Sequence, residues 1–232
     1  MTAILSNLQA TREAIIQAAR NVHREVNSVS LLAVSKTFSA QAVREAYQAG
    51  QCAFGENYVQ EALDKMAQLQ DLPLQWHFIG PIQSNKTRLI AENFAWVHGV
   101  DRLKIAQRLS EQRPAHLPPL NICLQVNVSA EASKSGVAPE AVEALAHAVA
   151  ALPRLCLRGL MAIPAPVDAG EIQAAPFAQM QQLLHALNQQ GMAMDTLSMG
   201  MSHDFSVAIQ EGATMVRVGT AIFGSRTSGE HT

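Results

Sequence analysis

The sequence predicts a single (β/α)8 barrel of the TIM type with an extra helix before the first strand. Short apolar runs alternate with amphipathic helical patterns along nearly the whole chain. Eight such runs in 232 residues are the number that a closed barrel needs. A doubly wound open sheet is the alternative, but the first turn after a strand, residues 35–38, lacks that fold's glycine-rich phosphate loop. We expect residues 1–225 to form one domain and residues 226–232 to be a disordered tail.

The elements follow from the spacing of apolar residues. Helical spacing over residues 4–26 predicts the extra helix, which would flank the core. The predicted strands are 31–36, 52–54, 74–79, 94–100, 120–128, 155–163, 196–199 and 214–218. The predicted helices between them are 41–49, 57–69, 84–92, 102–112, 139–151, 176–189 and 204–210, and residues 165–175 are expected to be an exposed loop.

Composition and charge exclude several classes of protein. With 48% hydrophobic and 16% charged residues, the chain can bury one large core. The formal net charge of -2, without a cluster of Lys and Arg, argues against nucleic acid as a partner. No apolar run spans a membrane and no signal peptide is recognisable, so we expect a cytoplasmic protein. Cys52, Cys123 and Cys156 lie in apolar runs without CxxC spacing, so we expect them buried, with no disulfide and no metal site.

Lys36 is the candidate reactive group, because it ends the first apolar run. Apolar surroundings disfavour the charged form of a lysine, so more of it is the free amine that attacks carbonyl groups. Lys36 at a barrel mouth would therefore suit Schiff-base chemistry. The simpler alternative is that Lys36 only extends from a strand end into solvent.

The loops after the last two predicted strands form a candidate phosphate site, where TIM barrels commonly bind phosphate. After the seventh strand, Gly200 allows close approach of a ligand, and Ser202 offers a hydroxyl and a cap for the next helix. After the eighth strand, Gly219 and Thr220 offer further donors. Each glycine alone is more simply a tight turn, but the two together at the expected strand ends favour phosphate.

Arg217 ends the eighth strand and is expected to point toward the barrel mouth. Its guanidinium only donates hydrogen bonds, so opposite a pyridine nitrogen it favours the unprotonated ring. An ion pair with Asp204 or Glu56 is the alternative. Lys36, Arg217 and the phosphate site together indicate pyridoxal 5'-phosphate (PLP), an aldehyde with a pyridine ring and a phosphate.

The sequence also resembles the family of pyridoxal-phosphate homeostasis proteins, single-domain barrels similar to the N-terminal domain of bacterial alanine racemase. The matching segments are 33–37 (AVSKT), 54–61 (FGENYVQE), 77–86 (HFIGPIQSNK), 134–136 (KSG), 159–161 (GLM), 197–202 (LSMGMS) and 216–224 (VRVGTAIFG). One departure is Phe38, where many relatives carry a further lysine, so a transfer role for that lysine has no counterpart here.

The resemblance implies how these residues would hold PLP. Lys36 would form the internal aldimine, and Arg217 would face the pyridine nitrogen. The residues implied to hold the phosphate are Ser202, Gly219 and Thr220.

The resemblance implies three further residues lining the pocket, namely Asn57, His77 and Met161. Each has a structural alternative: Asn57 as a helix cap, His77 as a hydrogen-bonded core histidine and Met161 as core filling. Lys86 and Lys134 also match family positions, although a charged residue on a loop is more often simply solvated.

The function predicted for this chain is PLP binding without catalysis, as a Schiff base on Lys36, in intracellular PLP homeostasis and delivery with effects on amino-acid and keto-acid balance. Racemases with an arginine like Arg217 use a second base, typically a tyrosine from an additional domain. We expect no such domain here, and the only tyrosines are Tyr47 and Tyr58. The alternatives are a weak PLP-dependent amino acid racemase and, less favoured, a cofactor-free Schiff-base aldolase. We expect a monomer, with PLP-dependent apo-enzymes as candidate recipients.

Overall fold

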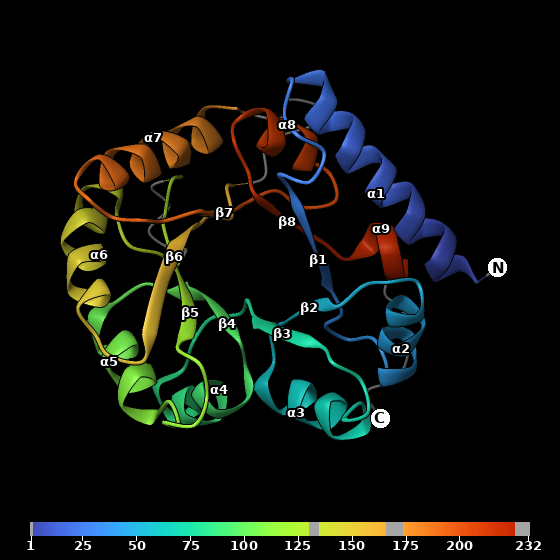
Figure 1. The fold of residues 1–232 in the computed structure, drawn as a ribbon, viewed down its shortest axis with the longest axis horizontal. Coiled ribbons are helices and arrows are strands. Elements are labelled where there is room, and N and C mark those ends of the chain that lie inside the picture. The colour runs from blue at the N-terminus through green and yellow to red at the C-terminus, as the bar shows by residue number, and fades with distance from the viewer. Residues whose placement is uncertain (1, 130–134, 166–173, 226–232) are drawn as a thin grey trace.

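The chain folds as a closed parallel barrel surrounded by helices (Figure 1). The structure is a computed structural model that describes residues 2–129, 135–165 and 174–225. Within these residues, eight strands pair in chain order and β8 closes the barrel against β1. Each strand is covered by helices outside and by other strands inside, so the strands are predominantly apolar on both faces. The predicted (β/α)8 barrel is therefore confirmed.

The bounds of the elements agree with the predicted ranges to within a few residues for most strands and helices. The strands are β1 Ser30–Val34, β2 Ala53–Glu56, β3 Gln75–Phe78, β4 Trp96–Val100, β5 Leu120–Gln125, β6 Leu155–Met161, β7 Thr196–Ser198 and β8 Met215–Val218. The helices are α1 Ala3–Asn21, α2 Ala40–Gln48, α3 Val59–Gln68, α4 Thr87–Asn93, α5 Leu103–Gln112, α6 Val142–Ala150, α7 Ala175–Gln189, α8 Phe205–Gln210 and α9 Thr220–Phe223, with 3-10 helices η1 Ser84–Lys86 and η2 Pro139–Ala141.

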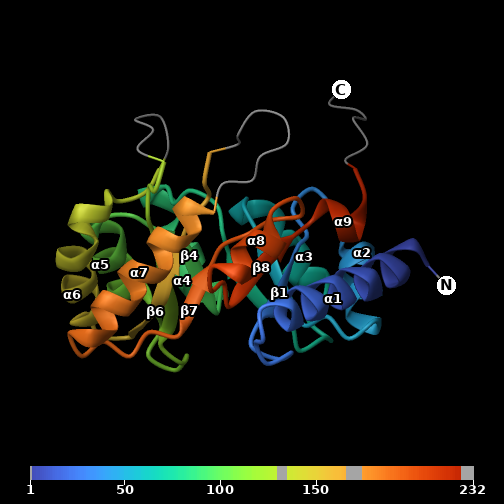
Figure 2. The same ribbon diagram turned by 90° about the horizontal axis from the view of Figure 1, so that it is seen from above.

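The extra helix α1 lies on the outside of the barrel, along α8 and α9 (Figures 1 and 2). Its apolar stripe, with Leu8, Ile15 and Ala19, is buried there. Burial of such a stripe against the barrel contributes more to helix stability than intrinsic propensity does. The predicted flanking position of this helix is therefore confirmed.

The end of α1 differs from the prediction, because the helix stops at Asn21 instead of near Val26. His23 adopts a left-handed backbone conformation with φ 56°, and the Arg24 N–H donates to the Ala19 carbonyl at 2.9 Å. This pairing closes a helix end that usually carries glycine at the left-handed position. With histidine there, the sequence contains no recognisable stop signal.

Two element ends near the barrel mouth also differ from the prediction. β1 ends at Val34, so Lys36 lies in the following turn and not within the strand. α8 begins at Phe205 with Asp204 as its N-cap, so Ser202 does not cap this helix as predicted. The Asp204 carboxylate instead accepts a hydrogen bond from the Met201 N–H at 2.5 Å.

The predicted burial of the cysteines is wrong for two of the three. Cys123 is buried, but Cys52 and Cys156 are exposed. Cys52 precedes β2, and Cys156 lies near the start of β6, where the barrel wall is open to solvent. Apolar neighbours in the sequence are therefore not sufficient to predict that a cysteine near the start of a strand is buried.

Some expectations fall outside the described residues. These are most of the loop 165–175, the tail 226–232 and Lys134. Among the helices that the structure describes, none combines the length and apolar character required to cross a membrane.

A substitution at Gly159 in β6 would test how closely β6 packs against β7. Gly159 pairs with Thr196 of β7, and an added Cβ would overlap the Thr196 carbonyl oxygen. Backbone cannot move aside cheaply, so we predict that Gly159→Ala lowers the free energy of unfolding by at least about 3 kcal/mol. At Gly55 in β2 an added Cβ would meet only side-chain ends, at 3.1 Å from Ile79 and 3.3 Å from Leu32.

The matched control is therefore Gly55→Ala, which should cost about 1 kcal/mol or less because the two side chains can shift. Urea unfolding followed by circular dichroism measures both variants. Equal losses of stability would contradict the tight β6–β7 packing.

Candidate functional site

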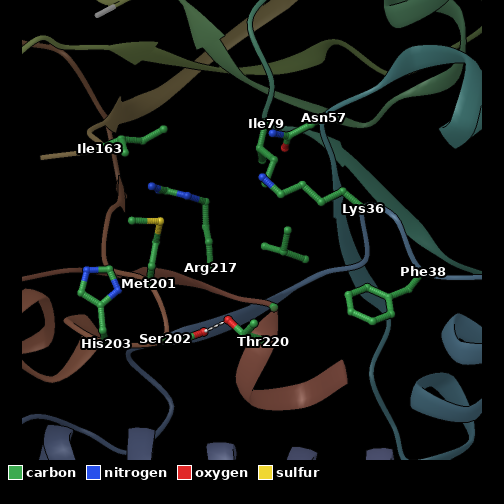
Figure 3. A pocket seen from close by; sticks show the side chains of 12 residues that line it. Lys36, Phe38, Asn57, Ile79, Ile163, Met201, Ser202, His203, Arg217 and Thr220 are labelled. Atoms are coloured by element: carbon green, nitrogen blue, oxygen red, sulfur yellow. Dashed lines mark hydrogen bonds between the residues drawn. The ribbon is translucent and has the colours of Figure 1, made fainter. Parts of the chain in front are cut away.

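A cavity of about 240 Å³ lies at the carboxyl ends of the strands. It brings together six of the eight residues predicted from sequence (Figure 3). These six are Lys36, Asn57, Ser202, Arg217, Gly219 and Thr220. The cavity is therefore the candidate functional site, at the face where TIM barrels place their ligands.

The rest of the wall consists mainly of residues that sequence reasoning did not identify. They are Val34, Phe38, Ile79, Ile163, Met201 and His203. Ile79 and Ile163 follow the ends of β3 and β6 by one and two residues. Each is the last residue of a strand predicted from sequence, which was the available signal, but apolar residues there look like ordinary core.

His77 and Met161 lie outside the lining of this cavity. Both are fully buried in the barrel interior. The His77 ring stacks on Trp96 with 5.3 Å between ring centroids, and Met161 packs against Trp96 and Cys123. Their contacts match the structural alternatives considered above, and a role in cofactor binding stays a prediction for both.

Lys36 enters the cavity from a tight turn after β1. Val34 and Lys36 line the cavity, whereas Ser35 between them is fully buried on the other side of the chain. The Phe38 N–H donates to the Ser35 carbonyl at 3.0 Å, which closes the turn. Thr37 has φ 70°, a left-handed conformation that is unfavourable for a β-branched residue. The Lys36 side chain thus extends from a turn whose backbone conformation is unfavourable at Thr37.

Two hydroxyl groups face each other on another wall of the cavity. Thr220 Oγ1 donates to Ser202 Oγ at 3.4 Å, joining the loops after β7 and β8 (Figure 3). Gly219 lies next to them, and a Cβ there would come within 3.1 Å of the Val34 carbonyl oxygen. A larger residue would therefore press on β1, so the glycine allows close packing beside the hydroxyl pair.

Asn57 carries an unpartnered polar atom at the cavity. Its Oδ1 is buried and has no hydrogen-bond partner among the described residues. The helix that follows begins at Val59 with Tyr58 as its N-cap, so Asn57 is not the helix cap. A buried amide oxygen without a partner is costly, and such atoms occur where a ligand or water completes the bonding.

Arg217 is buried at the cavity and held by three hydrogen bonds. Its Nη1 donates to the carbonyl and the hydroxyl of Ser198, at 2.6 and 2.8 Å, and its Nη2 donates to the Ala162 carbonyl at 3.0 Å. Burial lowers the pKa of Arg217 to about 10, so it remains charged at neutral pH. Glu56 instead pairs with Lys65, so Arg217 does not form the alternative ion pair with Glu56.

A chain of hydrogen bonds continues from Arg217 through the barrel interior. Ser198 Oγ lies 2.8 Å from His98 Nδ1, His98 Nε2 lies 2.9 Å from His77 Nδ1, and His77 Nε2 lies 3.1 Å from Gln75 Oε1. Ser198 accepts from Arg217, so its own hydrogen needs an acceptor, and His98 Nδ1 is the acceptor within reach. Each ring then carries its proton on Nε2. Ser198 donates to His98, His98 donates to His77, and His77 donates to Gln75.

The charges at the cavity have one sign. Lys36 and Arg217 line it, and no Asp or Glu occurs among the described lining residues. The His203 side chain is 64% exposed and lies 3.4 Å from the Asp204 carboxylate. A small anionic ligand therefore fits the charge of the site.

Comparison with known proteins gives a consistent result. The family model for the N-terminal domain of alanine racemase matches residues 8–227. A Pseudomonas aeruginosa protein named pyridoxal phosphate homeostasis protein is 63% identical over 229 residues, covering 99% of this chain and 98% of the relative. An Escherichia coli protein of the same name is 53% identical over 229 residues, covering 97% and 98%.

Solved structures share the fold. PipY of Synechococcus elongatus, determined with PLP bound, has a TM-score of 0.83 and 41% identity, covering 95% of this chain and 100% of that chain. The alanine racemase of Corynebacterium glutamicum has a TM-score of 0.67 at 21% identity and extends well beyond this chain, which covers 62% of it. At that identity the similarity shows the fold alone.

The hydrogen-bond chain yields a prediction about protonation. We expect His77 and His98 to stay neutral, with the proton on Nε2, between about pH 5 and 8. Burial lowers the pKa of His77 to about 3, and burial with the charge of Arg217 holds the pKa of His98 well below its ordinary value. Nitrogen-15 imidazole spectra of the folded protein measure both the charge and the tautomer.

The control is the same protein unfolded in urea, where both rings should protonate near pH 6.5. Since only the unfolded state binds these protons, each ring lowers stability by up to about 1.4 kcal/mol per pH unit as the pH falls below 6.5. A ring that becomes charged in the folded protein above pH 5 would contradict the assigned chain.

Proposed function

Because the chain belongs to the alanine racemase N-terminal domain family, and within it to the pyridoxal phosphate homeostasis proteins, we propose that it binds PLP covalently through Lys36. It would hold the cofactor for homeostasis and delivery without catalysing a reaction on it. One observation carries the proposal: Lys36, Arg217 and the Ser202–Thr220 hydroxyl pair, distant in sequence, line one cavity with no carboxylate among the described lining residues.

The residues at the cavity fit the chemical groups of PLP. When bound, PLP supplies an aldehyde that condenses with a primary amine, together with a pyridine ring and a phosphate. Lys36 is the primary amine on the wall, and the hydroxyls of Ser202 and Thr220 with the backbone at Gly219 would hold the phosphate. The buried, unpartnered Oδ1 of Asn57 supports a polar ligand beside it.

Arg217 would set the electronic state of the ring. The guanidinium remains charged and can only donate, so it keeps a facing pyridine nitrogen unprotonated. Its bonds to Ser198 and Ala162 restrict its position from behind. An unprotonated ring is a weaker electron sink, so the site would hold the cofactor without strongly activating amino acids.

The described residues that line the cavity include no tyrosine that could act as a second base, which supports a carrier. Neither Tyr47 nor Tyr58 is among the residues that line the cavity, and the Tyr58 residue is 58% exposed. Holding an aldehyde needs one amine and a phosphate site, whereas racemisation needs proton transfer on both faces of the substrate. The relatives at 63% and 53% identity are named for homeostasis and not for an enzymatic reaction.

A weak racemase is the second candidate, and His203 is the residue that favours it, because its imidazole lines the cavity. Sustained conversion of L-amino acids to D-amino acids by the purified protein would support that function. A cofactor-free aldolase is disfavoured by the homeostasis relatives and would purify without the yellow colour of PLP. Recipient apo-enzymes, a monomeric state and a cytosolic location stay predictions.

Lys36 and Ser202 should contribute differently to cofactor binding. We predict that Lys36→Ala folds but purifies colourless, because it lacks the amine that forms the covalent bond. Ser202→Ala should keep the colour and bind PLP roughly ten- to a hundredfold more weakly, because it loses one charge-assisted hydrogen bond of about 1.5–3 kcal/mol. Visible absorbance during PLP titration measures both effects.

The matched control is Lys104→Ala, which removes an exposed lysine of α5 and should bind PLP like the wild type. Treatment with borohydride should fix the cofactor on Lys36 in the wild type. Equal retention of PLP by Lys36→Ala and Ser202→Ala would refute the assignment of Lys36.

The cellular role has its own test. Deleting the gene should change the cellular levels of PLP or its vitamers, and a plasmid copy should restore them while a Lys36→Ala copy should not. Vitamer levels measured by chromatography decide this. Unchanged levels after deletion would leave PLP binding intact and remove the homeostasis role.

A further inference from the structure

We propose that Glu61 acts with Lys65 and Glu56 as a positioning group for Lys36. The cluster holds the residues on both sides of Lys36, Ser35 and Thr37, so that the Lys36 side chain is directed into the cavity. This inference rests on the proposed function, because it concerns how the PLP-binding amine is placed.

The centre of the cluster is the Lys65 ammonium, which is almost fully buried beneath the turn. Its three donors are used by three acceptors: Glu61 Oε1 at 2.6 Å, the Ser35 carbonyl at 2.7 Å and Glu56 Oε1 at 2.8 Å. A buried ammonium with all its hydrogens bonded in different directions has one well-defined position. The β1 turn, the end of β2 and α3 are therefore joined at one point.

Ser35 fixes which way Lys36 points. Val34 and Lys36 line the cavity, whereas Ser35 between them is buried on the other side of the chain. The Ser35 hydroxyl donates to Glu56 Oε1 at 2.6 Å, and Ser35 is fully buried there. Anchoring Ser35 outward, between barrel and helix, holds Lys36 on the inward side.

Thr37 is anchored by Glu61. The Thr37 N–H donates to Glu61 Oε1 at 2.5 Å. Thr37 has φ 70°, in the left-handed region that costs a residue other than glycine of the order of 1–3 kcal/mol. A charge-assisted hydrogen bond to this strained residue offsets that cost and keeps the turn closed beside Lys36.

A purely structural role is the alternative, in which the cluster only ties α3 to the barrel. Burying Glu56 and Lys65 has a desolvation cost that an exposed pair avoids, and the second oxygen of Glu56 has no partner among the described residues. Burial accordingly raises the pKa of Glu56, an effect that Lys65 opposes. A positioning role affects the reaction of the Lys36 amine, whereas a purely structural role does not. A ligand that binds the cavity without reacting with this amine therefore distinguishes the two roles.

The test compares two ligands. PLP reacts with the Lys36 amine, whereas pyridoxine 5'-phosphate has the same ring and phosphate with an alcohol in place of the aldehyde. We expect Glu61→Ala to weaken PLP binding about tenfold, because it removes the charge-assisted anchor of Thr37. Pyridoxine 5'-phosphate should bind this variant within about twofold of the wild type. Calorimetry measures both ligands, and absorbance measures the rate of covalent attachment of PLP.

Two further variants control for charge and for packing. Asp64→Ala removes an exposed carboxylate of the same helix, which accepts a hydrogen bond from Gln60. It should leave both affinities unchanged. Glu61→Gln keeps an oxygen that can accept from Thr37 and Lys65, and should recover most of the PLP affinity lost in Glu61→Ala.

The outcomes separate this inference from the proposed function. If Glu61→Ala weakens both ligands equally, or weakens neither, the positioning role is overturned while PLP binding by the wild type stands. If the wild type takes up no PLP, the proposed function fails and this inference fails with it. Thermal unfolding of each variant identifies any loss caused by unfolding, and the two affinities of Glu61→Ala are compared at a temperature at which that variant is folded.

Discussion

The pairing of β1 with β8 is the constraint on which the candidate site depends. Leu32 lies opposite Arg217 and Ala33 opposite Val218 in this parallel pair. The pairing brings the turn after β1 next to the loop after β8, although more than three quarters of the chain separates them. Without barrel closure, Lys36 and Arg217 would not line the same cavity. The residues of the site are therefore brought together by the topology of the barrel. How well they bind a ligand depends on how firmly the strand ends are held.

Polar groups around β1 are sorted into two layers with opposite charge. On the inner side, Lys36 and Arg217 line the cavity and attract an anion. On the outer side, Glu56 and Glu61 gather around Lys65 between the barrel and α3. The strand separates these layers, so the carboxylates support the turn without adding negative charge to the cavity wall. The turn after β1 and the strand β8 supply the inner layer, whereas β2 and α3 supply the outer one.

Sequence patterns were sufficient for the fold and for the charged residues at the strand ends. Periodicity located the strands, and the rule that ligands bind at their carboxyl ends selected Lys36 and Arg217. Periodicity does not report depth along the barrel, and so it could not separate His77, buried below the cavity, from Ile79, which lines it. It also could not pair Glu61 with the turn, because that contact depends on where α3 packs. Most of the apolar wall remained hidden for the same reason.

A carrier and an enzyme then differ in how many reactive groups the protein must hold in position around the cofactor. Reversible attachment of an aldehyde requires one amine held in the right direction, and hydrogen bonds anchor the turn at Ser35 and at Thr37, on both sides of Lys36. Catalysis would also require a proton donor fixed within reach of the reacting carbon. His203 has an exposed side chain that lies 3.4 Å from the Asp204 carboxylate, which is less support than the Lys36 turn receives. Among the described residues, hydrogen bonds gather at the Lys36 turn and not at His203, which supports the proposal that the site holds a cofactor without transforming a substrate.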